Sequence, residues 1–210
     1  FHAELLRQPE PEARDVALAI ELFTEGSLNT FAKPTNVDTN SRILCYDIRD
    51  LGRQLLPVGM LVVLDSIFNR IIRNRQQGRN TWIYIDEIYL LFQHEYSANF
   101  LFTLWKRVRK YRACCTGITQ NVDDLLQSHT ARTMLANSEF LVMLNQAATD
   151  RTELARLLNI SDNQLSYITN VDSGRGLIKC GSAIVPFVDS FPRHTRLYQM
   201  MTTRPSDLIA

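Results

Sequence analysis

The chain has 210 residues, of which 45% are hydrophobic and 21% are charged, and its net charge at neutral pH is +1. A chain of this length can bury the core of one large α/β domain, or of a domain with a subdomain. The near-neutral charge excludes a strongly basic nucleic-acid surface over the whole molecule, although it leaves room for a local basic patch.

The cysteines and histidines show no metal-site spacing. The four cysteines, at positions 45, 114, 115 and 180, lie in apolar segments, and the four histidines are scattered. We expect buried, reduced thiols in a cytoplasmic protein. We also expect no membrane-spanning helix, because the apolar run VGMLVVLDSIF is short and is interrupted by Asp65. Since the chain opens with Phe1, we expect it to be a piece of a longer protein.

The first 80 residues predict two helices with a strand between them. Pro11 and Gly26 bracket a helix, and a polar linker follows it. Residues 42–48 (RILCYDI) have the composition of a strand. A long amphipathic helix is predicted over residues 60–75, after a break at residues 57–59 (Pro-Val-Gly).

Residues 81–92 (TWIYIDEIYLLF) carry two adjacent acids, Asp86 and Glu87, at the end of an apolar run. Aromatic and β-branched residues of this kind suit a strand that is buried on both faces, as in a parallel sheet covered by helices. Buried carboxylates are costly unless they are paired, hydrogen-bonded or bound to a metal. Open α/β sheets bind their ligands at the tips of such strands. The acids therefore either cap the following loop or form the working end of a site.

The rest of the chain alternates between strands and helices. Helices are predicted at 98–111, from 122, at 149–160 and at 161–168, and strands at 113–119 and 139–145. Ser161 and Gln164 form a predicted capping box, and residues 176–187 read as a hairpin turning on Gly181 and Ser182. This alternation predicts an α/β fold with a mostly parallel sheet flanked by helices and a C-terminal β-hairpin.

The apolar strand followed by Asp86 and Glu87 has the form of a Walker B motif. In phosphate-hydrolysing sites such an Asp holds Mg²⁺, usually through water, and the next acid can polarise the attacking water. The motif alone does not distinguish this role from a simple loop cap. Gln120 follows Thr119 at the end of the next predicted strand, so its amide could lie close to Asp86 and Glu87. There it could sense a γ-phosphate or orient water, or it could be an ordinary loop amide.

Five basic residues crowd the end of the helix that follows the acids: Lys106, Arg107, Arg109, Lys110 and Arg112. For most of them we expect a solvated helix end, where cations complement the helix dipole. One arginine could instead reach the nucleotide of a neighbouring subunit as an arginine finger.

Several segments, taken in order, resemble a known family. WIYIDEIYLLF, LWKRVRKYRACCTGITQNVDDLL and ANSEFLVMLNQ resemble the C-terminal ATPase domain of the type IV secretion and conjugation ATPases, the VirB-four or TraC kind, within the FtsK–HerA superfamily of hexameric P-loop motors. The segment before the acids and the closing SGRGLIKCGSAIVPF extend the resemblance over roughly residues 20–190. It implies a RecA-like P-loop NTPase fold that is incomplete at its N-terminus. In this reading residues 1–40 are an N-terminal helix and linker, 41–190 the ATPase core with the Walker B half, and 191–210 a C-terminal tail.

The resemblance also implies roles for single residues. Asp86 would be the Mg²⁺ acid, Glu87 the catalytic acid and Arg109 the arginine finger. Gln120 would be the sensor, and Thr119 and Gln120 would bind the cofactor. The implied cofactors are ATP and Mg²⁺, and the implied function is a motor that couples ATP hydrolysis to the transfer of DNA or protein. Its partners would be other subunits of the channel, further copies in a hexamer, DNA, and the cytoplasmic face of the bacterial plasma membrane.

Two other functions stay open at this stage. The chain could be a non-catalytic module that docks onto channel components, or a translocase of the FtsK–HerA kind acting on duplex DNA. The phosphate loop G-x-x-x-x-G-K-[ST] is missing, because none of the eight glycines precedes Lys-Ser or Lys-Thr. Without its backbone amides and lysine, ATP loses most of its anchoring, so we expect this chain alone to bind ATP weakly and to hydrolyse little of it.

Overall fold

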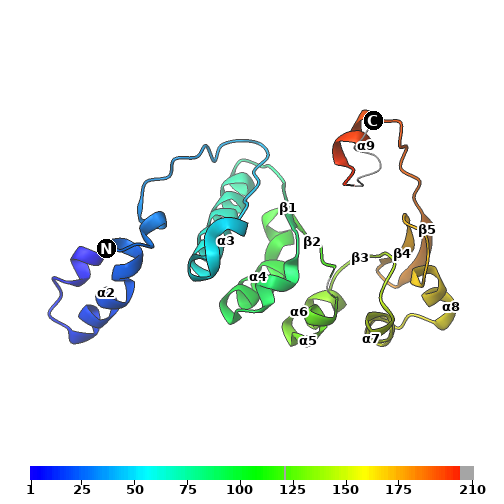
Figure 1. Cartoon of the computed structure of the whole chain (residues 1–210), viewed down its shortest axis with the longest axis horizontal. Coiled ribbons are helices and arrows are strands. Elements are labelled where there is room, and N and C mark those ends of the chain that lie inside the picture. The colour runs from blue at the N-terminus through cyan, green and yellow to red at the C-terminus, as the bar shows by residue number, and fades with distance from the viewer. Residues whose placement is uncertain (121, 204–210) are drawn as a thin grey trace. The chain divides into compact units, whose positions relative to one another are not determined.

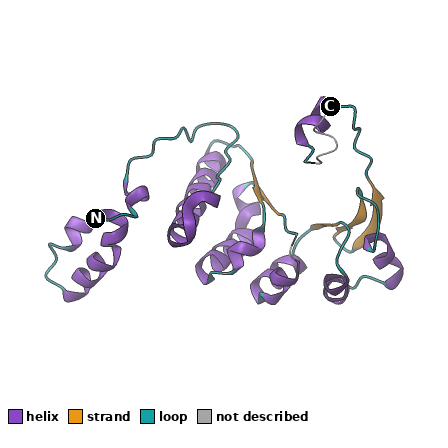
Figure 2. Ribbon diagram, in the orientation of Figure 1, coloured by secondary structure: helices purple, strands orange, loops and turns teal. Residues whose placement is uncertain are grey.

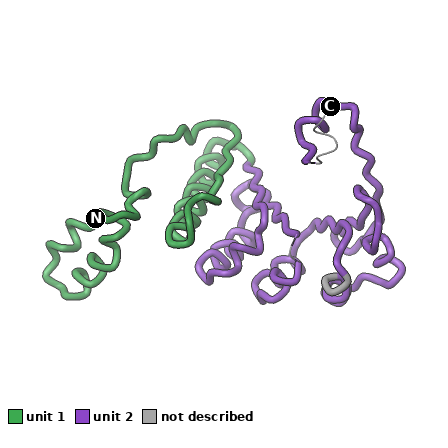
Figure 3. The backbone as a smooth tube through the Cα atoms, viewed as in Figure 1, with its two compact units in different colours: residues 1–80 green, residues 81–210 purple. Residues whose placement is uncertain are grey.

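The computed structural model describes residues 1–120 and 122–203 and forms two compact units, residues 1–80 and 81–210 (Figures 1 and 3). The division at residue 80 falls inside the range 41–190 that the sequence assigns to one ATPase core. The domain boundaries drawn from the sequence therefore stay a prediction, and each unit is described here by itself.

The first unit is helical. It contains α1 (His2–Leu5), α2 (Pro11–Thr24), η1 (Asn29–Ala32), η2 (Arg49–Leu51) and α3 (Gly52–Gln76). Helix α2 confirms the helix predicted between Pro11 and Gly26, with the proline in its first turn, where a missing N–H costs no hydrogen bond. Ala17 is the buried residue of this helix.

The strand predicted over residues 42–48 is wrong: this segment has no regular secondary structure and pairs with no strand in the described part of the chain. An unpaired strand leaves its backbone groups without partners, so they must be satisfied in another way. Most of this segment is exposed, so water can satisfy them. Just before it, the guanidinium of Arg70 in α3 donates to the carbonyl oxygens of Thr39 and, at 2.7 Å, of Ser41. The hydroxyl groups of Tyr46 and Ser66 lie 2.8 Å apart and tie the same segment to α3.

Helix α3 is longer than predicted, because it continues through Pro57 and begins at Gly52. Pro57 lies six residues into the helix and removes one backbone hydrogen bond without ending it. Met60, Leu64 and Ile71 are buried on one stripe. The helical stretch Arg49–Gln76 is long and apolar enough to cross a membrane, judged by length and composition alone, whereas the sequence predicted that its apolar run was too short. Buried core helices pass the same test, so a single helix of this kind is weak evidence.

The second unit opens with a βαβ arrangement (Figure 2). Strand β1 (Thr81–Ile85) leads through η3 (Ile88–Phe92), α4 (Glu95–Arg107) and η4 (Val108–Tyr111) to β2 (Ala113–Gly117). The two strands are parallel, with Thr81 opposite Ala113 and Ile85 opposite Gly117. The predicted helix 98–111 is thus an α-helix that starts three residues earlier and ends in a 3₁₀ turn.

The remaining elements include the three strands of a second, antiparallel sheet with order β3-β4-β5, together with the helices between and after them. They are α5 (Val122–Gln127), α6 (His129–Ala136), β3 (Phe140–Met143), α7 (Ala148–Leu158), α8 (Asp162–Leu165), η5 (Ser166–Ile168), β4 (Arg175–Cys180), β5 (Ala183–Val188) and α9 (Arg196–Met201). The capping box of Ser161 and Gln164 is confirmed, and so is the hairpin, in which Gly181 takes a φ of 55°.

The predicted α/β class, with a parallel sheet, helices and a C-terminal hairpin, is confirmed. The placement of residues 139–145 in that parallel sheet is wrong, because β3 pairs with β4 and not with β2. The alternation of strands and helices in a sequence does not show which strands pair. Here β3 pairs with β4, the first strand of the later hairpin. Within the described residues, β2 and β3 each keep one edge that no strand pairs.

Each sheet buries only one face. The β1–β2 pair has its buried side at Ile83 and Ala113, whereas Trp82 and Tyr84 on the other face are 65% and 66% exposed. In the second sheet Phe140 is similarly exposed. The prediction that the strand before the acids is buried on both faces is therefore wrong. Apolar residues on both faces are typical of a strand covered on both sides. In this structure other elements cover the β1–β2 pair on one side only.

The cysteine thiols also differ in how exposed they are. Cys45, Cys114 and Cys180 are exposed and Cys115 is half-buried, so the prediction of buried thiols is wrong for three of the four cysteines and only partly right for Cys115. Burial, and secondly the neighbouring Cys114, raise the pKa of the Cys115 thiol from 9.0 to about 12. Adjacent positions of one strand thus differ in chemistry because their side chains lie on opposite faces.

This difference predicts the order of alkylation at pH 9. Cys114 should react with iodoacetamide much faster than Cys115, because the thiolate is the reactive form and Cys115 stays protonated. Its folded-state pKa exceeds the unfolded value, so its contribution to stability should be full below pH 9 and lost as the pH rises toward 12. Mass spectrometry of the variants Cys114→Ser and Cys115→Ser would measure both rates. Equal rates in the folded chain would contradict the assigned faces.

Candidate functional site

The two acids lie at the carboxyl end of β1, directly after Ile85. Asp86 is exposed and Glu87 is half-buried. Glu87 has φ 48° and ψ 47°, the left-handed conformation, which is uncommon for a residue with a Cβ. The chain turns sharply there, and the 3₁₀ helix η3 begins at the next residue, so both acids lie in the turn at the carboxyl end of β1.

One residue of the neighbouring chain segment holds this turn from both sides. The N–H of Ile118 donates to the carbonyl oxygen of Ile85 at 2.8 Å, and the carbonyl oxygen of Ile118 accepts from the N–H of Ile88 at 3.0 Å. Asp86 and Glu87 lie between these two bonds. We call this arrangement the Ile118 clamp. It supports the left-handed turn, because a backbone conformation that costs free energy persists only where surrounding contacts fix it.

Two further contacts fix the polar atoms. The Glu87 N–H donates to Asp86 Oδ1 at 3.0 Å, and the main-chain N–H of Gln120 points to Glu87 Oε2 at 3.5 Å. The sequence predicted that the side-chain amide of Gln120 would approach the acids. The contact that the structure gives is made by its backbone instead. Thr119 lies half-buried between Ile118 and Gln120. Four of the five predicted site residues, Asp86, Glu87, Thr119 and Gln120, thus lie together where β1 and β2 end.

Arg109, the fifth predicted residue, lies at the other end of the strand pair. It belongs to η4, which comes before β2, and the N–H of Thr81 donates to the carbonyl oxygen of Arg112 at this end. Five residues of β1 separate that end from the acids, roughly 16 Å at about 3.3 Å per residue. Arg109 is exposed, and so are Lys106, Arg107, Lys110 and Arg112. Within one chain, the basic cluster and the acids therefore do not share a site.

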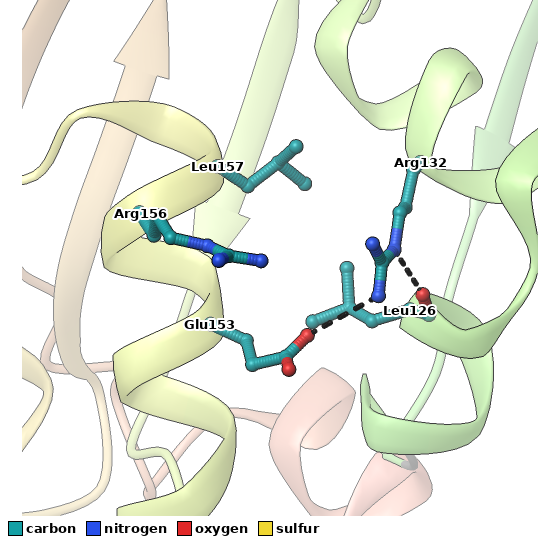
Figure 4. A pocket seen from close by; sticks show the side chains of 5 residues that line it. All are labelled: Leu126, Arg132, Glu153, Arg156 and Leu157. Atoms are coloured by element: carbon teal, nitrogen blue, oxygen red, sulfur yellow. Dashed lines mark hydrogen bonds and ion pairs between the residues drawn. The ribbon is translucent and has the colours of Figure 1, made fainter.

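A shallow pocket lies elsewhere in this unit, between α5, α6 and α7 (Figure 4). It is lined by Leu126, Arg132, Glu153, Arg156 and Leu157. Arg132 is already engaged there, because it pairs with Glu153 at 3.5 Å and its Nε donates to the carbonyl oxygen of Leu126. The pocket contains none of the predicted site residues, and its ion pair joins helices. We therefore place the candidate site at the carboxyl ends of β1 and β2.

Ile118 could not be predicted from the sequence, because only its backbone takes part in the clamp. Its side chain is 47% exposed and gives no pattern that would mark it. A hydrogen bond between main chains at two strand ends depends on register, which only the folded structure supplies. Gly117 was the one visible signal, since a glycine at the end of a strand often marks a close approach.

The left-handed turn can be tested without any activity measurement. Replacement of Glu87 by Val should destabilise the chain by about 1 kcal/mol relative to replacement by Asn, because Asn tolerates this conformation and β-branched residues do not. Urea unfolding of the two variants, followed by circular dichroism, would give the difference. Equal stabilities would show that residue 87 is not left-handed in solution.

Comparisons with known proteins identify the family and the fold of the chain. The TraG P-loop domain family matches residues 33–179, which include all five predicted site residues. The fold is similar to the structure of VirB4 of Thermoanaerobacter pseudethanolicus, with a TM-score of 0.75 and 24% sequence identity over 92% of this chain and 55% of that chain. A search of curated proteins gives no match. Because the family match covers well over half of the sequence, the chain belongs to the TraG P-loop domain family, as its resemblance to the conjugative transfer ATPases predicted.

Proposed function

We propose that this chain is the Walker B half of a motor that hydrolyses ATP and couples the reaction to the transfer of DNA or protein in conjugation or type IV secretion. One observation carries the proposal: the Ile118 clamp presents two carboxylates at the carboxyl end of a parallel strand pair. Ligands of open α/β sheets bind at that edge. The family match and the fold of VirB4 support the same function.

The proposed chemistry assigns one task to each acid. Asp86 is exposed and can hold Mg²⁺ through water. Glu87 is half-buried and can take up a proton from an attacking water or polarise it. The main-chain N–H of Gln120 keeps Glu87 Oε2 on this edge, which leaves the Gln120 side chain to report on the γ-phosphate. Thr119, next to it, would contribute to nucleotide binding.

The residues present fit a magnesium nucleotide. Carboxylate oxygens suit Mg²⁺, which proteins commonly hold with one or two acids together with substrate phosphates and water. In the described ranges, no group of three or more His, Cys, Asp or Glu residues could form a cage for a metal ion. Asp86 would therefore hold Mg²⁺ only in the presence of the phosphates, and the bound ion would supply neutralisation of their charge.

The phosphates themselves need a loop that this sequence lacks. No G-x-x-x-x-G-K-[ST] pattern occurs in the 210 residues, and the chain spans 55% of the solved VirB4 chain. We propose that further polypeptide of the same protein supplies the phosphate loop and covers the open faces at Trp82 and Phe140. The 210-residue chain alone would then bind ATP weakly and hydrolyse little of it.

Arg109 would act on a neighbouring subunit. Its position at the far end of β2 removes it from the acids of its own chain, so only a second copy could bring the two together. A homo-hexamer would do so at each interface. The other partners that fit this function are subunits of the transfer channel, at the cytoplasmic face of the plasma membrane.

Two other functions are separable from this one. A docking module would keep its assembly role when the acids are neutralised. A translocase acting directly on duplex DNA would use the exposed basic cluster from Lys106 to Arg112, and its DNA affinity would fall with salt and with loss of that cluster.

The first test is the replacement Glu87→Gln in the full-length protein. The turnover rate of ATP should fall at least about 10²-fold, because general base catalysis commonly contributes 10² to 10⁴. Binding of Mg²⁺-ATP should persist, since Asp86 and the phosphates remain. Phosphate release and nucleotide binding would be measured side by side.

Glu95→Gln is the matched control, because Glu95 is an exposed acid in the first turn of α4 and lies outside the site. It should hydrolyse ATP at the normal rate. Hydrolysis that survives Glu87→Gln would refute the proposed function. Transfer in cells that survives it would favour the docking module.

The second test asks whether Arg109 works across an interface. Arg109→Ala should lower turnover at least about 10²-fold, as arginine fingers contribute 10³ to 10⁵. Mixed oligomers of Arg109→Ala and Glu87→Gln subunits should regain activity, because some interfaces then join an intact Glu87 to an intact Arg109. Lys110→Ala serves as the control. Mixed oligomers that stay as inactive as either variant alone would exclude action between subunits.

A further inference from the structure

Gly117 is the last residue of β2 and lies opposite Ile85, one residue before the Ile118 clamp. Its φ is not in the left-handed region, which in this chain includes Gly52, Gly78, Gly174 and Gly181. An alanine could therefore adopt the same backbone conformation. The reason for a glycine here must be space.

The space above Gly117 is filled by Ile88. A Cβ at position 117 would lie 2.7 Å from Ile88 Cδ1 and 3.3 Å from Ile88 Cγ2. The first distance is shorter than real contacts of a Cβ, and Ile88 has little room to yield. Its side chain is only 5% exposed and packs in the cluster that contains Leu101 and Met134. Overpacking of such a site forces side chains or backbone to shift.

A shift of Ile88 would reach Glu87 directly. Ile88 is the residue after Glu87, and its N–H makes the second bond of the clamp, to the carbonyl oxygen of Ile118. The left-handed turn at Glu87 thus depends on Ile88 being seated in the core close to the bare Cα of Gly117. A methyl group at position 117 would lift Ile88 and turn the Glu87 carboxylate.

We propose that Gly117 is a positioning residue for Glu87, acting through Ile88, and this inference rests on the function proposed above. Gly117 touches neither nucleotide nor water in this role. It should affect the turnover step and leave nucleotide binding unchanged, because the phosphates are held by the phosphate loop. A misplacement of 1 Å in a reacting group can cost about 10²-fold in rate, so the effect should be large.

Three variants of the full-length protein test the contact by size. Gly117→Ala should lower the kcat of ATP hydrolysis about tenfold or more, with the KM for ATP little changed. Ile88→Val removes Cδ1, the atom nearest to the added methyl, and should lose less activity than Gly117→Ala. The double variant Gly117→Ala/Ile88→Val should recover most of the kcat that Gly117→Ala loses. Thermal unfolding of each variant would accompany the kinetics.

The outcomes separate the possible explanations. An unchanged kcat in Gly117→Ala, or a loss that Ile88→Val does not restore, would overturn the inference. A loss of thermal stability with normal kcat would show a structural role only, and would also overturn it. If Gly117→Ala fails to fold, the double variant must fold and hydrolyse ATP, or the inference fails. Glu87→Gln is run in parallel: its activity decides the proposed function, independently of Gly117.

Discussion

The candidate site depends on two backbone hydrogen bonds made by one residue. Ile118 donates to Ile85 and accepts from Ile88, and the two acids are the residues between those partners. Because both bonds come from one residue, the chain between Ile85 and Ile88 must turn, and it does so with Glu87 in the left-handed conformation. The same segment then brings the N–H of Gln120 to the Glu87 carboxylate and begins α5 at Val122. A loss of the strand register would remove all of these features together.

The parallel pairing of β1 and β2 also separates the charged groups. The acids lie at the carboxyl ends of the strands, while Arg109 and its basic neighbours lie before the amino end of β2. Opposite charges placed so far apart in one chain contribute little to each other through solvent. The same separation suits an assembly of several copies, in which one subunit presents the acids and the next presents an arginine. In the proposed motor, the contact between subunits would then decide activity.

Both sheets of the second unit have one packed face and one open face. In the second sheet, Met143 and Leu177 belong to the hydrophobic cluster that contains Ile168. In the first sheet, Ile85 packs against the cluster that contains Ile88 and Leu101. On the open faces, Trp82 and Phe140 expose large apolar surfaces. Burial of such surface contributes about 25 cal/mol per Å², so covering these side chains would be substantially favourable. Exposed apolar surface on this scale generally marks a place where other polypeptide binds. The proposed phosphate-loop segment therefore has a physical as well as a chemical reason to bind here.

The sequence by itself determined the order of the elements, the α/β class, the capping box at Ser161, the hairpin at Gly181 and the position of the acids after β1. These follow from local patterns: hydrophobic periodicity, turn residues and helix caps act over a few residues. Only the tertiary structure decided that residues 42–48 stay unpaired, that β3 joins the hairpin, and that Trp82 faces outward. It alone revealed the Ile118 clamp and the space at Gly117. Strand partners, exposed faces and main-chain bonds between distant residues depend on which segments meet in space, and residue type along the chain does not encode that directly.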